Sequence, residues 1–98
     1  MNFDERMTQD ARLCMLKELG RQADGRLNEI ALVAVLDTFA IKRTRDWVRT
    51  QLRRMEELDA VRIAEVGTVF VATLTRAGRD HIDRRALIEG IARPADEA

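Results

Sequence analysis

The sequence predicts one α+β domain, mostly helical, in which three helices precede a two-stranded β-hairpin and a last helix. Apolar residues recur at helical spacing in three segments before residue 59, and two β-rich runs with a glycine between them follow. The composition, 46% hydrophobic and 35% charged, is typical of an ordered globular protein rather than a disordered chain. A length of 98 residues suffices for a single modest core.

The first helix is predicted from Asp4 to Leu19, because this segment starts with acids and carries leucines at three-residue steps. Gly20 and the Ala23-Asp24-Gly25 stretch are expected to end it. Asn28 is a favourable N-cap for a second helix that runs to about Phe39. Since the body of that helix is apolar on nearly every side, we expect it to be wedged in the centre of the bundle.

The third helix is predicted from Thr44 to Leu58, with Thr44 as N-cap and an acid in the first turn. Val48, Leu52 and Met55 form one stripe, which is the expected core side. The opposite side is polar and rich in arginine.

Two strands are predicted on either side of Val66-Gly67-Thr68, one over residues 61–65 and one over residues 69–74. Thr75 can cap a last helix that reaches about Leu87. Gly90 and Pro94 then interrupt regular structure. We therefore expect a domain over residues 1–90 and a flexible tail over residues 91–98.

Three helices followed by a hairpin form the winged helix-turn-helix arrangement, in which the third helix is presented to the major groove of DNA. The spacing of Val48, Leu52, Met55, Leu58 and Val61 joins the core stripe of the third helix directly to the first strand.

Several stretches resemble the small proteins of Mu-like transposable phages and prophages that belong to the ArsR-type winged-helix regulators. The matching residues are Asp10-Ala11-Arg12-Leu13, Gly25-Arg26-Leu27-Asn28-Glu29, Arg45-Asp46-Trp47-Val48-Arg49 and the run V-F-V-A-T-L-T-R-A-G over residues 69–78. The resemblance covers nearly the whole chain. It implies a winged-helix fold in a phage or prophage, with DNA binding and transcription regulation expected from the fold.

The formal net charge is zero, so only the local distribution of charge can point to nucleic acid. Residues 42–54 hold six cations and one acid. We expect the solvent side of the third helix to contact bases of double-stranded DNA through Asp46, Arg49, Thr50 and Arg53. The alternative is a solvated helix face, in which Arg53 pairs with Glu57 and Asp46 with Arg49.

Cations at the start of the third helix oppose its dipole unless an anion is bound, which suggests phosphate contacts. The expected phosphate contacts are Arg26, Lys42, Arg43, Thr44, Arg45 and Arg62. Positive charge that serves solubility is the alternative. The hairpin tip, with Glu65 and no cation, favours another function, a winged-helix adaptor that binds protein in a phage assembly or DNA-handling complex.

A homodimer is expected through apolar residues of the first helix and the C-terminal region. The candidates are Met7, Ala11, Cys14, Met15, Ile82, Leu87, Ile88 and Ile91. The alternative is that the last helix simply packs on the first within one subunit.

The remaining residues predict neither catalysis nor cofactor or metal binding. The metal sensors among ArsR-type proteins use paired cysteines or His/carboxylate clusters, whereas this chain has only Cys14 and His81, far apart in sequence. The histidine lies in a charged stretch and is expected at the surface. With no nucleophile motif, no phosphate loop and no apolar leader, we expect a non-enzymatic protein of the bacterial host's cytoplasm that does not enter membranes.

Overall fold

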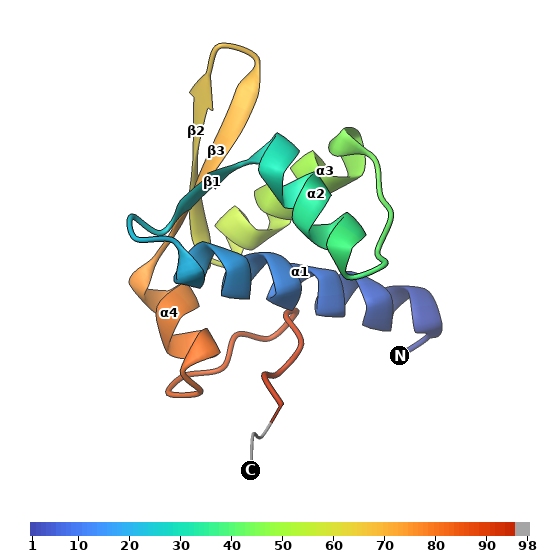
Figure 1. Cartoon of the computed structure of the whole chain (residues 1–98). Helices are drawn as coiled ribbons and strands as arrows, with labels where there is room; N and C mark the ends of the chain where they lie inside the picture. The colour runs from blue at the N-terminus through green and yellow to red at the C-terminus, as the bar shows by residue number, and fades with distance from the viewer. Residues whose placement is uncertain (96–98) are drawn as a thin grey trace.

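A computed structural model describes residues 1–95 as an α+β fold of four helices and one three-stranded antiparallel sheet. The elements, in chain order, are α1 (Phe3–Arg21), β1 (Arg26–Asn28), α2 (Glu29–Thr38), α3 (Arg45–Glu57), β2 (Val61–Val66), β3 (Val69–Leu74) and α4 (Arg76–Ile82). Figure 1 shows α1 lying across α2 and α3, with the β2–β3 hairpin projecting past the helices. The segment after α4 returns beneath α1.

Each helix begins at a side chain that accepts a hydrogen bond from an otherwise unpaired backbone N–H group. The predicted caps Asn28, Thr44 and Thr75 are confirmed, and Asn2 caps α1 in the same way. Gly20, by contrast, does not end α1. It lies inside the last turn, close to Ile82 and Arg79 of α4, and the helix ends one residue later at Arg21, with Gln22 as the C-cap.

The sheet has the order β1-β3-β2, and both pairings are antiparallel. The hairpin is confirmed, with Val66 opposite Val69 at the turn and Val61 opposite Leu74 at the base. Strand β1 was not predicted. It is three residues long and exists because it pairs with β3, more than forty residues further along the chain.

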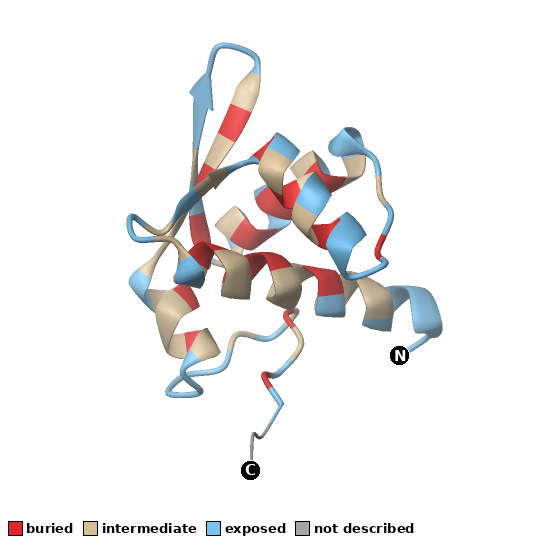
Figure 2. Cartoon of the chain, viewed as in Figure 1, coloured by how far each residue is buried: buried red, intermediate tan, exposed pale blue. Residues whose placement is uncertain are grey.

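The core lies between α1, α2, α3 and the inner face of the sheet (Figure 2). The predicted stripe of Val48, Leu52 and Met55 is fully buried. The expectation that α2 is enclosed on nearly all sides is wrong, because Ile30 is 55% exposed. Helix α2 packs against α1, α3 and the strands with one side and faces solvent with the other.

Helix α4 ends at Ile82 and not near Leu87, because Arg84 adopts a left-handed backbone conformation with φ of 63°. The chain then folds back around His81. This residue was expected at the surface, but it is fully buried. Its Nδ1 accepts from the Ile88 N–H at 2.9 Å, and its Nε2 lies 2.9 Å from the Ala92 carbonyl oxygen. The imidazole thus holds the returning segment in place.

The start of the predicted flexible tail is packed against the domain. Ile91 belongs to the core at 3% exposure, and the Ala92 N–H donates to the Gln9 carbonyl. Arg12 donates to Gln51 and to the Gly90 carbonyl, which ties α1, α3 and this segment together. Residues 96–98 of the predicted tail lie outside the described residues.

Replacing Gly78 by Ala should destabilise the fold, although Gly→Ala inside a helix is ordinarily favourable by up to about 1 kcal/mol. A Cβ at this position would lie 2.3 Å from the Ala60 carbonyl oxygen and 2.7 Å from Leu74 Cδ1. Because backbone must shift, we expect a loss of about 2 kcal/mol in the free energy of unfolding, measured by urea denaturation.

The matched control is Gly20→Ala in α1. Its new Cβ would meet only side-chain ends, Ile82 Cδ1 at 3.1 Å and Arg79 Nη1 at 3.2 Å, which can move. We expect a change within about 0.5 kcal/mol for this control. Equal losses for the two variants would show that the close contact between Gly78 and Ala60 does not constrain the fold.

Candidate nucleic-acid interface

Helix α3 and the β2–β3 hairpin form a continuous surface, and a buried carboxylate joins them. Glu29, the first residue of α2, is fully inaccessible to solvent. It accepts from Arg45 Nε at 2.6 Å, and Arg49 Nε lies 2.9 Å from its Oε1 and 3.2 Å from its Oε2. The Phe70 N–H of β3 donates to Oε2. One side chain therefore connects α2, α3 and the hairpin.

The same two arginines also hold the hairpin turn. Arg45 Nη2 donates to the Thr68 carbonyl oxygen at 2.6 Å, and Arg49 Nη2 donates to it at 3.2 Å. Each guanidinium therefore binds Glu29 through Nε and the turn through Nη2. This double attachment fixes the direction in which both side chains point.

The charge state of Glu29 follows from two opposed effects. Burial raises its pKa, but hydrogen bonds from Arg45 and the Phe70 N–H, together with the charges of both arginines, outweigh burial and hold the pKa below its ordinary value. The arginine side chains are 43% and 33% exposed, so water still screens this cluster from one side. Glu29 is thus an anion whose charge the two arginines neutralise.

A second set of contacts fixes the C-terminal half of α3 to the β2–β3 hairpin. The guanidinium carbons of Arg49 and Arg53 lie 3.9 Å and 4.5 Å from the ring centroid of Phe70, within cation–π range. Arg53 also pairs with Glu65 of β2 at 3.2 Å and with Glu56 at 3.6 Å. Glu56 in turn accepts from the Ile63 N–H of β2 at 2.9 Å.

The predicted base-contacting residues therefore divide into two groups. Asp46 and Thr50 are exposed on the solvent side of α3, and the Thr50 hydroxyl donates to the Asp46 carbonyl. Arg49 and Arg53 are engaged with the hairpin and with acids of the same chain. The alternative in which they pair locally is right that they form ion pairs, but the partners differ from those expected, being Glu29 for Arg49, and Glu56 and Glu65 for Arg53.

The predicted phosphate-contacting residues lie in two separate places. Lys42, Arg43 and Thr44 gather at the start of α3, where Arg43 stacks on Trp47 at 5.2 Å and Thr44 is the N-cap. Arg45 follows them but is bound to Glu29.

Arg26 of β1 and Arg62 of β2 are both paired in register with Thr73 of the central strand. Side chains in register share one face of a sheet. Both are exposed, while the alternate residues Leu27, Val61 and Ile63 face the core. Arg26 and Arg62 therefore lie on the same outer face of the sheet, away from the helices, with the central strand β3 between them.

Sequence reasoning missed Glu29 as a member of this site, although it lies in a stretch that carries the family resemblance, as do Arg45 and Arg49. It also left Arg54 without a role. Arg54 is half-exposed on α3, and its Nη1 lies 3.9 Å from Glu57. Arg54 follows Arg49 by five residues, which places it about 140° further around α3, so it lies outside the buried cluster and its side chain is 51% exposed.

Three of the eight predicted dimer residues are buried inside the single chain. Ala11 and Met15 are fully buried and Ile91 is 3% exposed, so these three cannot contact a second copy in this fold. Met7, Cys14, Ile82 and Ile88 are half-buried against the core, and Leu87 is 44% exposed.

Two further properties of the surface concern metals and membranes. Over residues 1–95, no three His, Cys, Asp or Glu side chains come together as a possible metal site. Within the same residues, no helix has both the length and the apolar character needed to span a membrane.

Comparison with known proteins places the chain beside a phage protein. It is 33% identical to the uncharacterized protein gp26 of Escherichia phage Mu over 92 residues, which are 94% of this chain and 95% of that protein. No protein-family model matches the chain, and no solved structure does.

Glu29→Gln should destabilise the protein by about 2 kcal/mol at neutral pH, less than for a fully enclosed ion pair because both arginines can turn toward water. The amide can still accept from the Phe70 N–H, so the loss reports the missing charge. Urea denaturation measures it. Glu57→Gln, which removes a surface carboxylate 68% exposed, is the control and should change stability by less than about 0.5 kcal/mol.

The same pair of proteins tests the pKa of Glu29. A carboxyl whose pKa is lower in the folded than in the unfolded state stabilises the fold fully above the unfolded value of about 4.3, and this contribution is lost as pH falls through the folded value. The stability difference between wild type and Glu29→Gln should therefore be constant from neutral pH down to about 5.5 and shrink below about pH 4. A difference that grows on acidification would contradict the lowered pKa.

Proposed function

The chain belongs to the Mu-like phage protein family that includes gp26 of phage Mu, and from this premise we propose that it binds double-stranded DNA as a winged-helix regulator of phage genes. The observation that carries the proposal is the placement of α3. Its solvent side is polar, its start is cationic, and the Glu29 cluster holds it rigidly beside a projecting hairpin. A helix and hairpin presented together suit the major groove and its adjoining backbone.

The connectivity supports the winged-helix assignment. The order α1-β1-α2-α3-β2-β3, with β1 and β2 on either side of β3, places one short strand between the first two helices and a hairpin after the third. In winged helix-turn-helix proteins the helix before the hairpin is the one that enters the groove.

The roles of the individual arginines in this proposal differ from those expected from sequence. Arg45 and Arg49 act as positioning residues, because their guanidinium groups bind Glu29 and the Thr68 carbonyl. Phosphate contacts are assigned to Lys42, Arg43 and Arg54, which remain outside that cluster. Contacts to base edges are assigned to the exposed Asp46 and Thr50, whose polar groups suit base-edge donors and acceptors.

A second candidate is a winged-helix adaptor that binds protein in a phage assembly or DNA-handling complex. The charges of α3 and of the hairpin tip favour it. Arg45, Arg49 and Arg53 are each paired with an acid of the same chain. The hairpin tip offers Glu65 and a 59%-exposed Val66 in place of a cation.

The decisive experiment is binding of a fluorescent DNA duplex of random sequence, followed by selection on phage DNA, at several salt concentrations. DNA binding predicts that affinity falls steeply with salt, because each phosphate contact contributes about 0.9 to the slope of log K against log salt. The variant Arg43→Ala/Arg54→Ala should lower that slope by about 1.8 and weaken binding to all sequences alike.

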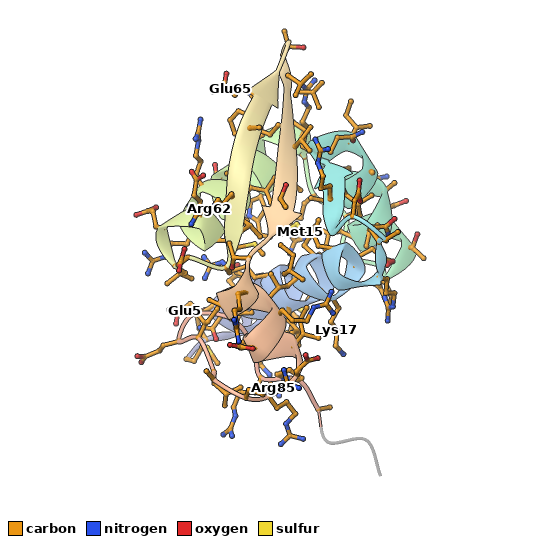
Figure 3. All side chains as sticks on the ribbon, turned by 90° about the vertical axis from the view of Figure 1, so that its left-hand side faces the viewer. Glu5, Met15, Lys17, Arg62, Glu65 and Arg85 are labelled. Carbon is orange, nitrogen blue, oxygen red and sulfur yellow. The ribbon has the colours of Figure 1, made fainter. Side chains whose placement is uncertain are left out.

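The matched control removes two arginines elsewhere. Arg76 starts α4, and Arg85 lies at the opposite end of the molecule from Glu65 of the hairpin (Figure 3). Arg76→Ala/Arg85→Ala should leave both affinity and salt slope unchanged. If wild type retains no duplex at low salt, DNA binding is wrong and the adaptor function is favoured.

A further inference from the structure

The sheet packs its inner face on the helices and leaves its outer face to solvent. Phe70 and Ala72 of β3 are buried, and Leu74 packs against the core. Because successive side chains of a strand point to opposite faces, the alternate residues of β3 point outward. Figure 1 shows α1, α2 and α3 gathered on the inner side of the hairpin. The outer face is therefore free to meet another molecule.

Four apolar residues form a block on this outer face, which we call the valine block. Val66 lies opposite Val69 across the hairpin. Ala64 lies opposite Val71 one row further from the turn. The hydrophobic core of the described residues includes none of these four, and Val66 is 59% exposed. The solvated face of an antiparallel sheet is ordinarily polar, whereas strands that are apolar on both faces are typical of sheets covered on both. The valine block thus has the character of a contact surface that the chain itself does not cover.

A polar row crosses the sheet next to the valine block. Arg26 of β1 and Arg62 of β2 are each in register with Thr73 of β3. Since neighbouring strands lie about 4.8 Å apart, the two arginine backbones are about 10 Å from each other with the threonine between them. Both arginines are exposed, and neither forms an ion pair with any of residues 1–95. Asp24 accepts only from the Arg26 backbone N–H. The outward-facing residues of the three strands thus carry two positive charges and no acid.

We propose that the outer face of the sheet docks an acidic, partly apolar segment of a partner protein. Apolar side chains of the segment cover the valine block, and its carboxylates bind Arg26 and Arg62, whose planar guanidinium groups suit carboxylate geometry. From Arg62 to Val66 the strand rises about 14 Å. A helix of about nine residues or a strand of about five spans this length, so a short segment can meet both parts of the face.

Other occupants match this face less well. A second copy of the same face would bring two more arginines and no acid, so like charges would oppose each other without neutralisation. Single-stranded nucleic acid binds on aromatic platforms, and the outward residues of these strands include no aromatic side chain. Phosphates of a duplex would meet the arginines but leave the valine block exposed. Arg26 and Arg62, expected from sequence to contact phosphates, are thus assigned carboxylate partners, and this assignment does not depend on whether α3 binds DNA.

The experiment starts with selection from a displayed library of random peptides of about 20 residues, long enough to cross the face as helix or strand. Enriched peptides should combine Asp or Glu with apolar residues. Fluorescence anisotropy then gives the dissociation constant of one enriched peptide. Arg26→Ala/Arg62→Ala should raise it at least about tenfold, since both charge-assisted contacts are lost. Val66→Thr/Val69→Thr, which keeps β-branched side chains in the strands, should raise it similarly.

The matched control removes two exposed arginines from the α3 surface. Arg43→Ala/Arg54→Ala should change the dissociation constant of the peptide by less than about twofold, because rim charges away from a contact have small effects. A charge exchange gives a result that unfolding cannot imitate. Arg26→Glu/Arg62→Glu should lose the selected peptide and gain binding to a version in which each Asp and Glu is replaced by Lys. Melting temperatures check that every variant is folded.

Selection that enriches no acidic peptide would overturn the proposal. So would an enriched peptide whose affinity is the same for wild type, the arginine variants and the valine variant. Duplex binding tests the nucleic-acid alternative, because Arg26→Ala/Arg62→Ala should leave the salt dependence of binding to a DNA duplex unchanged. A slope lowered by about 1.8 would show that these two arginines hold phosphates, and the carboxylate assignment would be wrong. The peptide measurements contain no DNA, so their failure is distinguishable from a failure of DNA binding by α3.

Discussion

The carboxylate of Glu29 joins three parts of the chain that are far apart in sequence. Two arginines of α3 and the Phe70 N–H of β3 converge on it, and the arginines continue to the carbonyl of the hairpin turn. A buried anion is tolerated only when it is paired and fully hydrogen-bonded, so the arrangement of these partners is narrowly restricted. The direction of the hairpin relative to α3, and hence the shape of the surface they share, depends on this one side chain.

The cluster also changes how an arginine-rich helix should be interpreted. Six cations in residues 42–54 look like a nucleic-acid surface when only the sequence is known. In the folded chain Arg49 and Arg53 stack on Phe70 and pair with acids, so part of that positive charge stabilises the protein itself. What remains for a partner is a smaller set of cations at the start of α3 and at Arg54. A local excess of charge is therefore an upper bound on the charge that a partner meets.

The features that could be predicted from sequence are those decided by neighbours along the chain. The N-caps Asn28, Thr44 and Thr75, the core stripe of α3 and the hairpin all follow from local hydrogen bonding or side-chain periodicity. The features that were missed depend on partners distant in sequence. Strand β1 exists only beside β3, and His81 is buried because the chain returns over it.

The candidate site shows the same division. That α3 is amphipathic and cationic could be predicted, whereas the acid that neutralises its arginines could not, since Glu29 belongs to another helix. At the start of α2, Glu29 looks like an ordinary first-turn acid that favours the helix dipole. Its second role becomes visible only when α3 and the hairpin are placed around it.

The hydrogen bond between Glu56 and the Ile63 N–H bears on how the protein behaves at high concentration. Strand β2 is an edge of the sheet, and an edge strand with unpaired N–H groups can recruit a strand from another molecule and start aggregation. Glu56 occupies the middle of that edge, and the Arg53–Glu65 pair adds charge beside it. An incoming strand would have to displace a carboxylate and lie against charged side chains, so this edge of the sheet is protected against the addition of a further strand.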